Sequence, residues 1–446
     1  MRARLRELTA SHGSLHSAAV SQVGDHRLTR QADGARVITA PMRERTSVAI
    51  SIMVAAGSRH EPDERAGLAH FIEHMVFKGA ERHPDARAIS EAIEGVGGVL
   101  NAATDKEMTM FWAKVPSEHL ELAAEVLGDM VWHSRFDPGE LGKERDVVIE
   151  ELRMYLDNPQ DHVGTLFEEV MWPAHALGRD TAGTEESVRA LERQHCLDFL
   201  ERRYTRDAVV VSIAGGVSEE RAVEAASRAV GGWTANGRTP VSPAPDLEEG
   251  AERLRCINRR TEQANLCIGA RSRSYTDPDR FAVDMLTTVL GEGMSSRLFL
   301  RLREEMGLVY DVHAFTVKHR DSGALGIYIG CEPRRAAAAL EAAIAELERL
   351  AGELVSEAEM HKARSYITGR MLVQLEGTSS LCNYLGQQEL LTAEILTPAE
   401  VVERFAAVTA EDVRRLAAET LAEGLRGAVI GPFPKPDRFL RVLART

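Results

Sequence analysis

The 446-residue chain contains few aromatic residues, few cysteines and fewer basic than acidic residues. Phenylalanine, tryptophan and tyrosine together make up 5% of the chain, which disfavours a surface that stacks aromatic rings on nucleic-acid bases. The formal net charge of -14 argues against a polyanionic partner and favours basic ligands. The composition therefore predicts a protein that does not bind nucleic acid.

The five cysteines are scattered along the chain, and no C-x-x-C pair occurs. This distribution disfavours a disulfide framework or a cysteine zinc site and fits a reducing compartment. No apolar run is long enough to span a bilayer. Residues 1–24 are Arg-rich and then polar, without the apolar core of a secretory signal. We favour a frayed polar tail over the alternative of a mitochondrial transit peptide, and we expect a cytoplasmic protein without a membrane partner.

The chain is longer than the chains that ordinarily fold around a single hydrophobic core, so two or more domains are expected. Residues 236–250 contain three prolines and no periodic apolar pattern, which is typical of an exposed linker. We therefore predict a polar tail at 1–24, a domain at 25–235, a linker at 236–250 and a second domain at 251–446.

The two halves of the chain show weak self-similarity. Each contains an alternating apolar pattern typical of a strand, then a turn signal, then apolar residues at helical spacing. Phe136–Leu152 can also be aligned with Val355–Met371. Glu140 then falls opposite Glu359. These patterns predict an α+β fold of two homologous domains, each with a sheet and flanking helices, rather than a doubly wound fold.

The stretch GLAHFIEHM, from Gly67 to Met75, contains the motif H-x-x-E-H. Residues spaced by three and four share one face of a helix, so His70 and His74 can direct their imidazoles at one metal ion. Glu73 lies beside them, where it can hold a metal-bound water, in the inverted order of H-E-x-x-H. Chance should produce this pattern in roughly one such chain in twenty. A polar helix face with two ordinary histidines therefore stays open as the alternative.

A catalytic zinc site has three protein ligands and keeps one position for water, so a third ligand is needed. We predict a helix from Pro138 to about Asp157, on which Glu144 and Glu151 share one face. Glu151 can bind the ion while Glu144 accepts the free N–H of a ligating histidine. Glu150 is the alternative ligand, although it points about 100° away around the helix. A solvated acidic face is the alternative for the helix as a whole.

With these motifs the chain resembles the pitrilysin-type, or inverzincin, zinc metallopeptidases, specifically their half-length branch related to mitochondrial processing peptidase. The family has a glutamate ligand 77 residues after the second histidine, and Glu151 lies 77 residues after His74. Another family glutamate precedes that ligand by seven residues, which corresponds to Glu144. The resemblance, which extends from about residue 25 to about residue 432, implies one zinc ion per chain. His70, His74 and Glu151 would hold it, with Glu73 as the catalytic base.

Two further segments resemble family substrate sites. GGVLNAATDKEMTMFWAKV is similar to the edge strand that binds substrate, which implies that Asn101 and Ala102 hold the peptide backbone. GEGMSSRLFLRLREEMGLVYDVHAF is similar to the segment whose arginine and tyrosine contact substrate. These correspond to Arg303 and Tyr310. The tyrosine is expected to help stabilise the oxyanion.

Processing peptidases have two acidic residues after the glutamate ligand that receive a substrate arginine. The corresponding residues are Asp161 and Thr165, so this chain keeps one of the two charges. We therefore do not predict a strict preference for arginine.

The resemblance implies two homologous domains with mixed, largely antiparallel sheets, of which only the first binds metal. It also implies a homodimer in which Arg303 and Tyr310 complete the active site of the other subunit. The expected activity is a zinc endopeptidase that cleaves unfolded peptides or short presequence-like segments inside a closed chamber. The alternative is a non-catalytic structural or partner subunit, although such relatives have usually lost the H-x-x-E-H residues.

Overall fold

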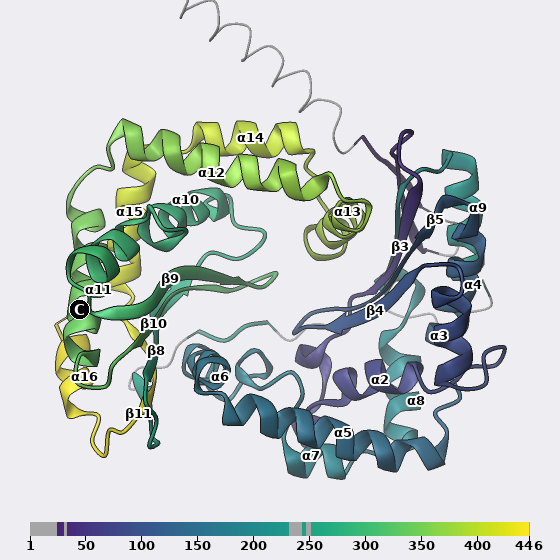
Figure 1. Ribbon diagram of the computed structural model, residues 1–446, viewed down its shortest axis with the longest axis horizontal. Coiled ribbons are helices and arrows are strands. Elements are labelled where there is room, and N and C mark those ends of the chain that lie inside the picture. Colours follow the sequence, from purple (N-terminus) through teal and green to yellow (C-terminus); the bar gives the residue numbers. More distant parts are fainter. Residues whose placement is uncertain (1–24, 31–33, 232–242, 247–250, 446) are drawn as a thin grey trace, which may run out of the picture. The chain divides into compact units, whose positions relative to one another are not determined.

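The computed structural model describes residues 25–30, 34–231, 243–246 and 251–445 (Figure 1). The predicted tail at 1–24 and most of the predicted linker at 236–250 lie outside the described residues. Packing divides the chain into two compact units. The first comprises Met1–Ile149, Thr181–Val241 and Thr368–Glu403, and the second comprises Glu150–Asp180, Ser242–Ile367 and Arg404–Thr446.

The first unit contains a six-stranded sheet in the order β1-β2-β6-β3-β5-β4. Strands β2 and β6 are parallel, and the other neighbours are antiparallel. The central strands β3 and β6 are almost entirely buried, because helices cover both faces of the sheet. The strands are β1 (Arg27–Arg30), β2 (Arg36–Pro41), β3 (Ser47–Val54), β4 (Val99–Thr104), β5 (Thr109–Pro116) and β6 (Val209–Gly215).

Helices α4 and α9 cover one face of this sheet, and α13 covers the other (Figure 1). Hydrophobic residues of α13 join those of β2, β3 and β6 in one buried cluster. These and the neighbouring helices are α2 (Leu68–Val76), α3 (Ala86–Glu94), α4 (Leu120–Trp132), α7 (Glu185–Arg189), α8 (Arg193–Arg203), α9 (Glu219–Ala229) and α13 (Thr378–Thr392). Three more helices cross from one unit into the other: α5 (Pro138–Asp157), α12 (Glu357–Leu375) and α14 (Pro398–Ala407).

The second unit contains a five-stranded sheet in the order β7-β11-β8-β10-β9. Without β1, the first sheet has this same order, with each strand number lower by five. The parallel pair β7–β11 also corresponds to β2–β6, and the remaining pairs are antiparallel. The predicted α+β fold with two homologous domains is therefore confirmed. The strands are β7 (Leu254–Asn258), β8 (Ala264–Ser272), β9 (Val309–Lys318), β10 (Gly323–Cys331) and β11 (Arg426–Gly431).

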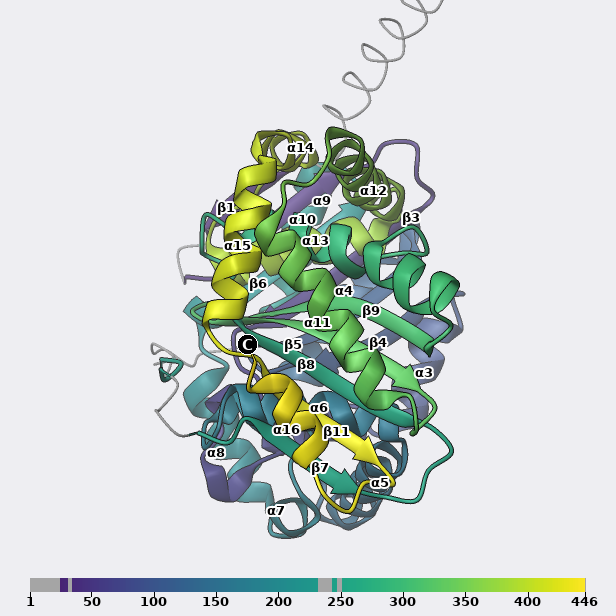
Figure 2. The same ribbon diagram turned by 90° about the vertical axis from the view of Figure 1, so that its left-hand side faces the viewer.

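Helices α10, α11 and α15 pack on one face of the second sheet, and α16 packs on α11 (Figure 2). Helix α6 covers the other face through a buried cluster centred on Phe167, Trp172 and Tyr328. The helices are α6 (Pro159–Met171), α10 (Arg280–Gly291), α11 (Ala336–Gly352), α15 (Ala410–Ala422) and α16 (Asp437–Leu443).

Each sheet is thus covered on one face by a helix from the other half of the sequence. Helix α6 precedes the predicted linker but packs on β8 and β11, whereas α13 follows the linker and packs on β3 and β6. The predicted boundaries at 25–235 and 251–446 describe the order along the chain and stay a prediction.

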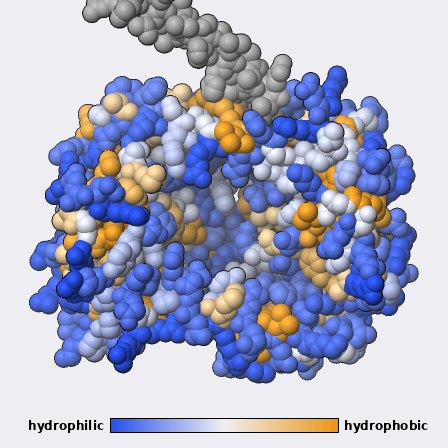
Figure 3. Space-filling view, in the orientation of Figure 1, coloured by the Kyte–Doolittle hydropathy of each residue, from blue (hydrophilic) through white to orange (hydrophobic). Residues whose placement is uncertain are grey.

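Hydrophilic side chains dominate the face shown in Figure 3, and hydrophobic residues are scattered among them. Throughout the described ranges, every helix is either too short or too polar to cross a membrane.

Candidate metal centre

Helix α2 carries the H-x-x-E-H motif and begins after Gly67, whose φ of 91° favours glycine. A Cβ atom on Gly67 would lie 2.4 Å from the carbonyl oxygen of Ala182. His70, Glu73 and His74 are half-buried. The buried residues of the helix are Leu68, Ala69, Phe71, Ile72, Met75 and Val76.

A carboxylate holds the N-terminus of α2. Glu61 is buried, and its oxygens accept hydrogen bonds from the backbone N–H groups of Gly67 (2.8 Å) and Ala69 (2.6 Å). A negative charge is favourable at this end of a helix. The sequence did not indicate Glu61 as a cap, because it lies six residues before Gly67 and not at a local capping position.

Helix α5 has the predicted bounds, Pro138 to Asp157. Asp137 accepts a hydrogen bond from the backbone N–H of Gly139 at 2.7 Å and so caps the start of the helix. Asn158 ends this segment and caps α6. The division between the two units falls inside α5, so one continuous helix positions both Glu144 and Glu151.

The side chains of His70, His74 and Glu151 meet at one place. Each offers one ligand atom, and these atoms lie within 4.8 Å of one another. The centroids of the two imidazole rings are 4.7 Å apart. In the described part of the chain this is the one group of three such side chains that can hold a metal ion. Two imidazole nitrogens and one carboxylate oxygen fit a catalytic zinc ion, which takes three protein ligands and a water.

Glu144 lies behind this group, as the sequence predicted. Its Oε2 atom is 3.3 Å from Nδ1 of His74, which leaves Nε2 of that ring to face a metal. Its Oε1 atom is 2.6 Å from Nζ of Lys78. Glu150, the alternative ligand, is exposed and pairs with Arg153 at 2.7 Å. The sequence pattern did not single out Lys78.

Two tyrosines without a motif signal lie close to the acidic groups. Tyr155 follows Glu151 by one helical turn, and the charge of Glu151 is the main cause that raises the pKa of Tyr155. Tyr204 is fully buried, and burial raises its pKa. The nearby charge of Glu73 adds to that rise. Tyr155 lies on α5 and Tyr204 directly follows α8, and neither was singled out from the sequence.

Asn101 and Ala102 lie on β4, the last strand of the six-stranded sheet. Asn101 is exposed, and its Oδ1 atom accepts a hydrogen bond from the backbone N–H of Ala102 at 2.8 Å. Asp161 is in the first turn of α6, where its carboxylate accepts a hydrogen bond from the Asn158 side chain at 2.5 Å. Thr165 lies one turn further along α6.

Arg303 and Tyr310 belong to the second unit. Arg303 is exposed on a short π-helix, η6 (Phe299–Glu305), with its guanidinium carbon 5.0 Å from the centroid of the Phe299 ring. Tyr310 lies near the start of β9, the last strand of the five-stranded sheet, and is 55% exposed.

The second unit lacks metal-binding side chains at the corresponding positions. When the strand, turn and helix patterns of the two halves are aligned, Met285, Thr288 and Val289 of α10 correspond to His70, Glu73 and His74. All three α10 residues are buried. Ala363 and Arg370 of α12 correspond to Glu144 and Glu151. At these aligned positions, the later half of the chain therefore lacks the side chains that meet in the earlier half.

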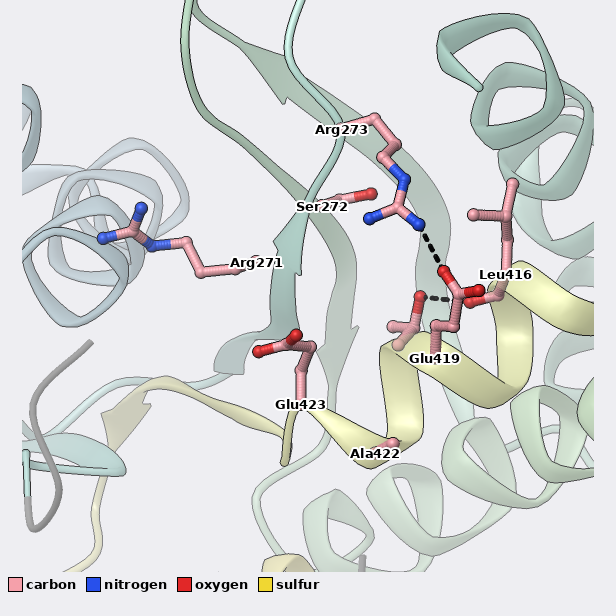
Figure 4. A pocket seen from close by; sticks show the side chains of 8 residues that line it. Arg271, Ser272, Arg273, Leu416, Glu419, Ala422 and Glu423 are labelled. Atoms are coloured by element: carbon pink, nitrogen blue, oxygen red, sulfur yellow. Dashed lines mark hydrogen bonds and ion pairs between the residues drawn. The ribbon is translucent and has the colours of Figure 1, made fainter. Parts of the chain in front are cut away.

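The second unit also contains a pocket of about 290 Å³ (Figure 4). Arg273 forms an ion pair with Glu419 at its wall. Arg271 donates a hydrogen bond to the carbonyl oxygen of Met171 at 2.6 Å, and burial lowers its pKa to about 10. The lining residues are Arg271, Ser272, Arg273, Leu416, Glu419, Thr420, Ala422 and Glu423. They include neither histidine nor cysteine.

Known proteins are similar to the chain in sequence and in fold. Residues 36–185 match the family model described as Insulinase (Peptidase family M16), and residues 190–367 match that described as Peptidase M16 inactive domain. The chain is 35% identical to the uncharacterized zinc protease YmxG of Bacillus subtilis over 90% of this chain and 97% of that protein. It is 34% identical to an uncharacterized zinc protease of Mycobacterium leprae over 98% of both.

A solved structure of a protease from Helicobacter pylori has the same fold, with a TM-score of 0.86 and 20% sequence identity. The match covers 92% of this chain and 100% of that one. The chain belongs to peptidase family M16, as its motifs predicted.

Proposed function

We propose that the chain is a zinc-dependent endopeptidase that cleaves unfolded peptides or short presequence-like segments. The convergence of His70, His74 and Glu151 carries this proposal. Glu73 lies on the same helix as the two histidines, and we propose that it is the general base. The names of the relatives from Bacillus subtilis and Mycobacterium leprae, both zinc proteases, support zinc as the metal. We propose one zinc ion per chain.

The residues have separate roles in the proposed reaction. A bound zinc ion supplies Lewis acidity and lowers the pKa of a bound water. Glu73 accepts the proton of the attacking water and then delivers it to the departing amine. Glu144 fixes the ring of His74 through Nδ1. Tyr310 donates a hydrogen bond to the oxyanion that forms at the scissile carbonyl.

The peptide is proposed to add to the sheet beside β4. Within the described residues, β4 pairs with β5 on one side only. A peptide that extends along Asn101 and Ala102 would be held by backbone hydrogen bonds, which demand little of its sequence. Arg303 and Asp161 are proposed to bind other parts of the substrate.

We also propose a cytoplasmic homodimer that encloses its substrate in a chamber. The three residues proposed to bind the metal lie in residues 36–185, which match the peptidase family model. Arg303 and Tyr310 lie in residues 190–367, which match the inactive-domain model. A second copy of the chain would supply this pair. A non-catalytic subunit is the alternative, but a purely structural zinc site is normally closed by a fourth protein ligand, and here Glu73 stands beside three.

Metal removal tests the proposed function. The purified protein should contain about one zinc ion per chain and cleave a set of unstructured peptides. Chelation should abolish cleavage while the circular dichroism spectrum stays unchanged, and added zinc should restore it. Cleavage by metal-free protein, or a zinc-loaded protein that cleaves none of the peptides, would contradict the proposal.

A further inference from the structure

We propose that Lys78 is a positioning residue of the metal centre and acts on His74 through Glu144. The inference rests on the proposed zinc site, but metal binding tests it independently of peptidase activity.

Glu144 is held at both ends of its carboxylate. The side chain is 5% exposed, and its two oxygens face different partners. Oε2 lies 3.3 Å from Nδ1 of His74, and Oε1 lies 2.6 Å from Nζ of Lys78. The contact with Lys78 is the shorter one. It therefore fixes the orientation in which the carboxylate meets the imidazole.

The charge of Glu144 requires this partner. A buried carboxylate is costly unless an opposite charge and hydrogen bonds compensate it. A histidine that binds metal is neutral, so His74 can donate a hydrogen bond to Glu144 but cannot supply a charge. Lys78 supplies the charge, and its side chain is only 27% exposed.

The same contact joins the two helices that carry the metal ligands. The backbone N–H of Lys78 donates to the carbonyl oxygen of Met75, so the lysine closes the C-terminal end of α2. A cation is favourable at this end of a helix. Glu144 belongs to α5, two turns before Glu151. The Lys78–Glu144 pair thus connects the end of α2 to the ligand face of α5.

Helix α5 offers a matched control. Lys143 pairs with Glu140 at 2.7 Å, a distance similar to that of the Lys78–Glu144 pair. The side chain of Lys143 is 70% exposed, and exposed pairs contribute little. Removing this lysine changes the same charge without touching the buried carboxylate.

The experiment measures the zinc dissociation constant of the metal-free protein by competition with a chromophoric chelator. Lys78→Met should weaken zinc binding by roughly 10–100-fold, the range typical of changes to residues that orient a metal ligand without binding the metal. Lys143→Met should change it by less than about twofold. Glu144→Gln should also weaken binding, and Lys78→Met/Glu144→Gln should bind zinc no more weakly than Glu144→Gln alone, because the lysine acts through the glutamate.

Unchanged zinc binding in Lys78→Met, or effects that add in the double variant, would overturn the inference. If Lys78→Met does not fold, Lys78→Gln takes its place: zinc binding weakened by the same roughly 10–100-fold supports the role, and unchanged zinc binding overturns it. A protein that shows the expected zinc affinities but cleaves no peptide would defeat the proposed function and leave this inference standing.

Discussion

The neighbouring glutamates of α5 show how one residue position separates a ligand from a surface charge. Glu151 shares a face with Glu144 and meets the two histidines, whereas Glu150 points into solvent and pairs with Arg153. The H-x-x-E-H group could be predicted because helical geometry fixes which residues share a face. Glu61, Lys78 and Tyr204 could not be predicted, because their roles depend on contacts between separate segments.

We predict that Glu151→Gln weakens zinc binding by more than roughly 10–100-fold, because a ligand is lost. That range is typical of changes to residues that only support a ligand. Glu150→Gln should leave zinc binding unchanged. Metal content of the two purified variants, measured by mass spectrometry, checks this. Loss of zinc from Glu150→Gln alone would move the ligand to Glu150.

At the scale of elements, helical spacing predicted α2 and α5, and the weak self-similarity of the two halves indicated that they are homologous. Those signals did not predict which sheet each helix covers. A helical apolar pattern says that one face is buried but not what buries it. The sheets that α6 and α13 cover therefore could not be predicted. In the structure, each of these helices packs on the sheet of the other half of the sequence.

The start of α12 provides a prediction about pH. Glu359 accepts hydrogen bonds from Arg297 at 2.9 and 3.1 Å and from the hydroxyl of Ser356 at 2.9 Å. The bond from Arg297 is the main cause that lowers the pKa of Glu359 to about 2. Because the pKa is lower in the folded state, the stabilisation is complete above about pH 4.5 and is lost as the pH falls towards about 2.

We therefore expect Arg297→Met to lower the urea midpoint of unfolding at pH 7 and to lower it less at pH 3. Circular dichroism at both pH values measures the difference. Arg301→Met is the control, since the Arg301–Glu305 pair is exposed, and it should have a small effect at pH 7. An equal lowering of the urea midpoint by Arg297→Met at both pH values would show that Arg297 does not lower the pKa of Glu359.

In the molecule as a whole, the described residues contain one group that can hold a metal ion and one Arg303–Tyr310 pair. The homology of the two domains explains this division, because the second domain has Met285, Thr288 and Val289 where the first has its motif. Under the proposed homodimer, each active site combines the metal centre of one subunit with the pair of the other.

Mixing two inactive variants tests the homodimer. Glu73→Gln and Tyr310→Phe should each be nearly inactive alone. After exchange at equal concentrations, about half of the dimers should be mixed, each with one intact site, so roughly a quarter of wild-type peptidase activity should return. If native mass spectrometry shows exchanged dimers and no activity returns, the tyrosine acts within its own chain.

The proposed function depends on Glu73 as the base beside a zinc ion held by His70, His74 and Glu151. Glu73→Gln tests this role, because the substitution keeps the shape of the side chain and removes only the proton acceptor. Zinc content and peptide cleavage are measured on the same sample. We predict that zinc stays at about one ion per chain while turnover falls by at least about a hundredfold. Loss of zinc together with activity would make Glu73 a ligand, and unchanged turnover would show that another group is the base.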